Sequence, residues 1–160
     1  MKTKVNEFPR SLSYCVLALA LLFTACESES VDEVVPEPDQ ITFTKGDGAD
    51  PTVAANQDRI TDNVWITRGN DGGQIFNIQV NSVYNKDTSP VDTEWAIGSK
   101  ENRESLTFGS FRNTIKPQEA VGRDLVMHLI SDDIYLNVRF TRWASGKQGG
   151  FTYIRDEVPQ

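Results

Sequence analysis

Hydrophobic and polar residues alternate with a period of two along much of the chain after residue 40, which is the pattern of half-buried β-strands. The longest such run is Asp132–Arg155, DDIYLNVRFTRWASGKQGGFTYIR, where two alternating stretches flank a Gly-rich loop. We predict a long β-hairpin here. The core-facing side of its first strand comprises Ile134, Leu136, Val138 and Phe140, and the other side comprises Tyr135, Asn137, Arg139, Thr141 and Trp143.

The charges of this hairpin indicate its register. The register that we expect has these pairs: Ala144 with Phe151, Arg142 with Tyr153, and Phe140 with Arg155. A shift by one residue would set Arg139 directly against Arg155, and like charges in opposed positions destabilise a sheet. The expected register groups the following residues on the second face: Trp143, Thr141, Thr152, Ile154 and Arg139.

Shorter segments of the same kind precede the hairpin, separated by clusters of Gly, Pro, Asn and Asp. The predicted strands are Ile41–Thr44, Val64–Arg68, Gln74–Tyr84, Leu106–Arg112 and Leu125–Ile130. The last of these is continuously apolar, so we expect it to be buried on both faces. Pro117–Val121 fits a single helical turn. Short strands at this spacing predict one all-β domain over residues 41–160, an antiparallel β-sandwich, with a small β-barrel as the alternative.

The hairpin is similar to a motif, DxYxxxxFTxW…GGFxYxR, of a family of uncharacterised secreted and surface lipoproteins of bacteria. Three further stretches, ITFTKGDGADPT, QDRITDNVWITRG and SPVDTEWAIG, are similar to parts of the same proteins, so the resemblance covers Ile41–Arg155. Members usually have one more Gly before the aromatic of GGF, where this chain has Gln148. The resemblance implies membership of a group and no activity.

The chain begins with the features of an export signal. Basic residues within Met1–Arg10 precede Tyr14–Phe23, an apolar run of ten residues, whereas a transmembrane helix needs about 20. Cys26 directly follows the small residues of a cleavage site. FTAC resembles the lipobox of bacterial lipoproteins, although Phe23 stands where Leu is usual. The resemblance implies that residues 1–25 are a signal peptide and that Cys26 carries a lipid anchor to the membrane; ordinary secretion is the alternative.

Residues 26–40 are acidic, contain two prolines and lack aromatic side chains. Such a segment cannot bury enough apolar area to offset its ordering entropy, so we predict a disordered tether after the lipidated cysteine. Acidic residues at this place resemble the signal that sends some Gram-negative lipoproteins to the cell surface. This resemblance implies a lipid-anchored protein of the outer membrane that is exposed at the surface, with the periplasmic face as the alternative.

Charge and cysteine content exclude several classes of function. The chain has 16 basic and 23 acidic residues, of which three and one lie in residues 1–25, so the remainder carries a formal charge of −9. Nucleic acid is a poor partner for such an acidic domain, because its phosphates require a basic surface. Once Cys15 leaves with the signal peptide and Cys26 is lipidated, no thiol remains for a disulfide or a thiolate nucleophile. No cofactor is indicated.

The candidate metal sites and catalytic sites are weak. His128 is the only histidine, so a His-based zinc site is not expected and a structural role is favoured. The aspartates of 47–50 and 58–62 could offer oxygen ligands to Ca²⁺, but their residue types are equally those of tight turns. The acids considered for glycoside hydrolysis are Asp132, Asp133, Glu94 and Glu119. A chain this acidic always offers such pairs, so we expect no enzyme, and a small carbohydrate-active hydrolase is the least favoured interpretation.

The tryptophans suggest a binding surface. Trp65 and Trp95 lie in runs that predict core positions, whereas the expected register sets Trp143 on the polar face near an open loop. Exposed Trp with Arg nearby is typical of binding surfaces, so Trp143, Thr141 and Arg139 are the candidate ligand-binding residues. The alternative is that a second sheet covers Trp143. We therefore expect a non-catalytic binding module for glycan or protein, or else a structural or assembly component of the outer membrane.

Overall fold

The domain is a sandwich of two antiparallel sheets. The computed structural model describes residues 40–159, and the predicted signal peptide, Cys26 and most of the tether lie outside the described residues. None of the helices within 40–159 combines the length and the apolarity that crossing a membrane requires. The prediction of an all-β sandwich is confirmed, and the sheets do not close into the alternative barrel.

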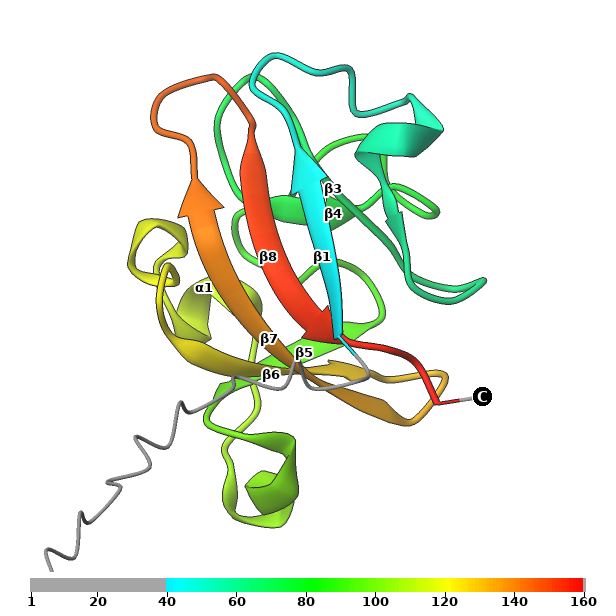
Figure 1. Cartoon of the computed structure of the whole chain (residues 1–160), viewed down its shortest axis with the longest axis vertical. Helices are drawn as coiled ribbons and strands as arrows, with labels where there is room; N and C mark the ends of the chain where they lie inside the picture. The colour runs from blue at the N-terminus through cyan, green and yellow to red at the C-terminus, as the bar shows by residue number, and fades with distance from the viewer. Residues whose placement is uncertain (1–39, 160) are drawn as a thin grey trace, which may run out of the picture. The chain divides into compact units, whose positions relative to one another are not determined.

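The larger sheet has five strands in the order β1-β8-β7-β6-β5, and Figure 1 shows β8 between β1 and β7. Its strands are β1 (Gln40–Lys45), β5 (Thr93–Ile97), β6 (Asp124–Leu129), β7 (Ile134–Trp143) and β8 (Phe151–Asp156). The smaller sheet consists of β2 (Asp58–Arg59), β3 (Trp65–Arg68) and β4 (Ile75–Asn77), with β3 in the centre. The short helices are η1 (Ala54–Asn56), η2 (Lys100–Ser105), α1 (Phe111–Thr114) and η3 (Pro117–Glu119).

The hydrophobic core lies between the two sheets and includes side chains from both. Ile66 and Ile75 of the smaller sheet join Leu136 and Phe140 of β7 in one buried cluster. The inward face that the alternation predicted for the hairpin is confirmed, as is the burial of both faces of β6 over Leu125–Leu129. Ile130, the last residue of the predicted strand, lies beyond β6 and is exposed. Trp95 is fully buried as expected. Trp65 is only half-buried, and its ring lies beneath the guanidinium of Arg59, 4.1 Å from ring centroid to Cζ.

The predicted register of the hairpin is wrong. The pairs in the structure are Trp143 with Phe151, Arg142 with Thr152, Phe140 with Tyr153, Arg139 with Ile154, and Val138 with Arg155. The offset changes between Phe140 and Arg142, so Thr141 is the extra residue of a β-bulge. The observed pairing also keeps Arg139 and Arg155 from opposing each other, but by a different offset from the expected one. The bulge turns Trp143 toward the core, where it packs against the buried cluster.

Two predicted strands are shorter or absent. Gln74–Tyr84 forms a strand only over Ile75–Asn77, because the buried Asn77 side chain ends the pairing. Its Oδ1 accepts the backbone N–H of Trp65 at 3.0 Å and that of Gln79 at 3.1 Å, which bends the chain into a turn. Leu106–Arg112 forms no strand beyond a single bridge from Gly109 to Trp95. Pro117–Glu119 forms the expected helical turn.

Three Gly-rich loops meet at one end of the sandwich, and this explains much of the sequence motif. The N–H of Gly48 donates to the carbonyl of Gln148 at 2.7 Å. A Cβ on Gly149 would stand 2.2 Å from Asn70 Oδ1, and one on Gly150 would stand 2.0 Å from Asp47 Oδ1. Only glycine permits this approach, so the GGF segment is a packing requirement of the loops.

Candidate functional site

The outer face of the five-stranded sheet carries polar residues in rows across the strands, because opposed residues of antiparallel strands point to the same face. One row runs from Thr42 through Ile154 and Arg139 to Asp124. Arg139 donates from Nη1 to Asp124 Oδ1 at 2.6 Å, and both side chains are exposed. Arg139 therefore lies on the outer face, as the alternation predicted.

The segment around η2 is held against this face by a small polar network. Asn137 Oδ1 accepts the backbone N–H of Lys100 at 2.8 Å. Lys100 Nζ lies 2.6 Å from Asp156 Oδ2, and the same oxygen accepts the backbone N–H of Asn137 at 3.0 Å. Leu106 packs so closely on Gly98 that a Cβ there would stand 2.8 Å from its Cδ2. The segment thus forms a wall on the sheet with a hollow on each side.

The hollow on the strand side, which we call the η2 cleft, has a volume of about 600 Å³. Its lining comprises Gln40, Gly98, Ser99, Asn102, Asp124, Leu125, Asn137, Val138, Arg139 and Ile154. Three of these side chains are amides that can both donate and accept hydrogen bonds. The opposite-charge pair Arg139–Asp124 stands beside Ile154, which is half-buried. The cleft therefore offers a polar, nearly neutral surface with apolar contact area.

A second hollow, of about 550 Å³, lies beyond η2 and is lined by Lys100, Glu101, Arg103, Asp133, Ile134, Tyr135 and Pro159. The guanidinium of Arg103 stands over the ring of Tyr135, with 5.5 Å between Cζ and the ring centroid. The other face of that ring stacks on His128, with centroids 3.9 Å apart and an interplanar angle of 3°. A cation already occupies one side of Tyr135 and an imidazole the other, so this ring is not free to stack on a ligand.

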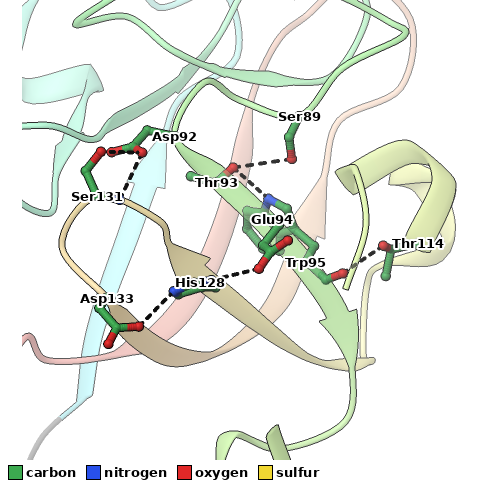
Figure 2. Close-up of polar contacts among 9 residues, drawn as sticks. All are labelled: Ser89, Asp92, Thr93, Glu94, Trp95, Thr114, His128, Ser131 and Asp133. Carbon is green, nitrogen blue, oxygen red and sulfur yellow. Dashed lines mark hydrogen bonds and ion pairs between the residues drawn. The ribbon is translucent and has the colours of Figure 1, made fainter. Parts of the chain in front are cut away.

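His128 lies between two carboxylates, as Figure 2 shows. Its Nδ1 is 2.8 Å from Glu94 Oε1 and its Nε2 is 3.3 Å from Asp133 Oδ1. Each ring nitrogen therefore has a carboxylate oxygen within hydrogen-bond distance. With both ring nitrogens engaged and the ring stacked on Tyr135, the histidine connects β5, β6 and the β6–β7 turn. This geometry agrees with the structural role that the sequence favoured.

The hydroxyls near His128 are directed elsewhere. Ser131 donates from Oγ to Asp92 Oδ1 at 2.8 Å, as Figure 2 shows. Thr93 donates to the carbonyl of Pro90 at 2.7 Å. Neither is bonded to the imidazole, so the nucleophile–base contact of a hydrolytic triad is not made there. The hydroxyls of Ser131 and Thr93 instead fasten the start of β5 to neighbouring turns. The hydroxyl of Thr114 in α1 donates to the carbonyl of Trp95 in β5.

The other acids singled out from the sequence are engaged in local structure. Asp132 accepts from Thr61 Oγ1 at 2.7 Å and from Asn63 Nδ2 at 2.8 Å. Glu119 pairs with Lys116 at 2.9 Å on the surface. In the Asp-rich loops, Asp50 accepts from the N–H and hydroxyl of Thr52, and these bonds lower its pKa. Within residues 40–159 no group of three or more His, Asp or Glu side chains is placed to hold a metal ion.

The three hairpin residues proposed from the sequence do not form one surface. Trp143 lies on the inner side, with its ring centroid 4.1 Å from Arg68 Cζ and aromatic neighbours such as Phe111. Thr141 is exposed at the bulge and lines none of the hollows described above. Arg139 alone lines the η2 cleft. The alternative in which Trp143 belongs to the core is therefore the one that the structure supports.

The burial of Asp58, Arg155, Lys45 and Arg68 was not predicted from the sequence. Asp58 and Arg155 form a bidentate pair across the two sheets, with Nε to Oδ2 at 2.7 Å and Nη2 to Oδ1 at 2.9 Å. Lys45 and Arg68 are also buried, and they bind carbonyl and amide oxygens of the Gly-rich loops. Charged residues within strands usually face solvent, and these partners are distant in sequence, so no local pattern could have indicated them.

None of the protein-family models, characterised proteins or solved structures with which the chain was compared matches it. The resemblance of the hairpin motif to a lipoprotein family therefore stays a prediction.

Proposed function

We propose that this chain is a lipid-anchored, non-catalytic binding protein of the outer membrane, exposed at the cell surface, whose domain binds glycan in the η2 cleft. Cys26 carries the lipid in this proposal and residues 27–39 form the tether, because β1 begins at Gln40. The lipobox resemblance and the acidic segment after Cys26 support the anchor and the location.

The observation that carries the binding proposal is the composition of the cleft. Its amide side chains come from three separate parts of the chain, since Gln40 lies in β1, Asn137 in β7 and Asn102 in η2. Sugar hydroxyls require partners that donate and accept, and amides do both. Ile154, which is half-buried, supplies the apolar contact that most ligand sites contain. A protein ligand would need a larger buried area than this hollow offers.

The proposal is tested by a glycan array followed by titration calorimetry with the purified full chain. Asn102→Ala should weaken binding of the selected glycan by about fivefold, because a lost hydrogen bond contributes roughly 1 kcal/mol. Thr141→Ala is the matched control, since Thr141 is exposed on the same strand as Arg139 but outside the cleft. This variant should bind like the unmodified chain.

A chain that binds no glycan on the array, or binding that Asn102→Ala leaves intact, contradicts the proposal. If the protein instead co-purifies stably with another envelope protein and binds no glycan, the structural or assembly role is the better account. A turnover screen on polysaccharides tests the hydrolase interpretation separately.

A further inference from the structure

A small cavity of about 130 Å³ lies at the end of the sandwich where the loop after β7 meets α1 and η3. We call it the arginine pocket; it is lined by Arg68, Gly73, Arg112, Pro117, Gln118, Ala144 and Gly146. It shares no residue with the η2 cleft, so a ligand bound here would be separate from the proposed glycan site.

Arg68 forms the inner wall of the pocket and is only 2% exposed. Its Nε donates to the carbonyl of Gly73 at 3.1 Å, and its Nη1 donates to the carbonyls of Ala144 and Gly150, both at 3.1 Å. Within residues 40–159 no carboxylate forms an ion pair with Arg68, and its Nη2 takes part in no hydrogen bond. Burying a guanidinium without a counter-charge is costly. The inner wall therefore presents a charge that lacks an anionic partner.

The surroundings of Arg68 strengthen this imbalance. Lys45 is fully buried nearby, and its Nζ donates to Asn70 Oδ1 at 2.9 Å, which is a neutral acceptor. Burial lowers the pKa of Lys45, and the charge of Arg68 lowers it further. Asp47 is the carboxylate that opposes both cations, and it already forms an ion pair with Arg142. Lys45 and Arg68 thus place two buried positive charges at this end of the domain.

The outer wall supplies a second guanidinium and an amide. Arg112 in α1 and Gln118 in η3 are both exposed and line the same pocket. Gly146, with φ of 64°, leaves the mouth unobstructed, since a Cβ there would meet nothing within 4 Å. The two guanidinium groups and the amide of Gln118 together form a set of hydrogen-bond donors for an anion. A guanidinium can donate two parallel N–H hydrogen bonds to two oxygens of a carboxylate, sulfate or phosphate.

We propose that the arginine pocket binds a single oxyanion group, with Arg68 and Arg112 as the charged donors and Gln118 as a further donor. The volume suits one carboxylate, sulfate or phosphate group and excludes a sugar ring from its interior, since it equals the space of only a few water molecules. The anion neutralises the charge of Arg68, which also donates hydrogen bonds to the carbonyls of three loop residues. Binding of the anion therefore stabilises this end of the domain.

The experiment titrates the purified full chain with sulfate, inorganic phosphate, acetate and glucuronate at constant ionic strength, and it follows heat by calorimetry and the melting temperature. Glucose is the neutral control for glucuronate. We expect saturable binding of at least one oxyanion at about millimolar concentration and a raised melting temperature. Binding of the free ions alone assigns the site to small anions, and preference for glucuronate over glucose assigns it to an acidic sugar; either result supports the proposal.

Arg68 holds loops together, so the diagnostic variant is Arg112→Gln, on the exposed wall. It should weaken anion binding about tenfold while the chain stays folded. Lys147→Gln removes one positive charge from the same surface without touching the pocket, and it should bind as the unmodified chain does. No saturable binding of any of the four oxyanions overturns the proposal, as does equal weakening by the two variants, which would indicate only general attraction to positive charge.

Discussion

Replacing Asp58 with Asn should strongly destabilise the domain, because the substitution leaves a buried charge without its partner. Asp58 accepts three hydrogen bonds, from Tyr153 Oη at 2.6 Å, Arg155 Nε at 2.7 Å and Arg155 Nη2 at 2.9 Å. The side chains of Arg155 and Asp58 are 4% and 7% exposed. Asn has nearly the same shape, so the change removes the charge and one accepting oxygen without opening a cavity.

The expected loss is about 3–5 kcal/mol of unfolding free energy, the usual cost of breaking a buried pair from one side. This is a large part of the roughly 5–15 kcal/mol that stabilises an ordinary domain. With a urea dependence of about 2 kcal/mol per molar, the unfolding midpoint should fall by about 2 M. Removing Arg155 as well, as Asp58→Asn with Arg155→Met, should restore part of the loss because no unpaired charge remains.

Urea unfolding followed by tryptophan fluorescence measures these changes, and Asp124→Asn is the matched control. The Arg139–Asp124 pair has a contact of 2.6 Å, but its side chains are 53% and 71% exposed. Its loss should therefore cost less than about 1 kcal/mol. If Asp58→Asn and Asp124→Asn reduce stability equally, burial does not govern the strength of the inter-sheet pair and the reasoning fails.

Two further predictions concern the lipid anchor and the stability of the domain at alkaline pH. Cells fed an alkyne fatty acid should label the unmodified chain and Cys15→Ser but not Cys26→Ser, because the proposal attaches the lipid to Cys26; a labelled Cys26→Ser chain would disprove the anchor. Burial, and next the charge of Asp58, raise the pKa of Tyr153 well above its ordinary 10.0. The unfolded chain then loses this proton first, so stability should fall as pH rises beyond about 10. Tyr153→Phe should flatten that fall in unfolding free energies measured from about pH 8 to 11, and an equal slope in both proteins would contradict it.

The fold class could be predicted because alternation reports which face of a strand is buried. The inward face of β7 and the double burial of β6 followed directly from side-chain pattern. The same signal failed at Gln74–Tyr84, where alternation continues but the buried Asn77 side chain replaces the strand's hydrogen bonds with a turn. It also missed β5 and the two-residue β2, whose pairing depends on partners elsewhere in the chain.

The candidate sites were less predictable than the fold, because both are made by distant segments. Arg139 was identified from its place on the polar face, but the η2 cleft exists only because Asn137 and Asp156 hold Lys100 and its neighbours over the sheet. The arginine pocket brings together Arg68 and Arg112 through loop packing alone. Sequence pattern indicates which face a residue takes, and it does not indicate which loops cover that face.

The bulge at Thr141 determines what each face of the hairpin can do. Strict alternation would set Trp143 beside Arg139 on the outer face, where the two would resemble a binding surface. The extra residue turns Trp143 inward against Phe151, and Arg68 covers its ring. Thr suits a strand with or without a bulge, so propensity cannot reveal the change. As a result the hairpin lines two separate hollows. Arg139 lines the η2 cleft, and the loop that begins at Ala144 lines the arginine pocket. Trp143 contributes to either one only by holding the hairpin in place.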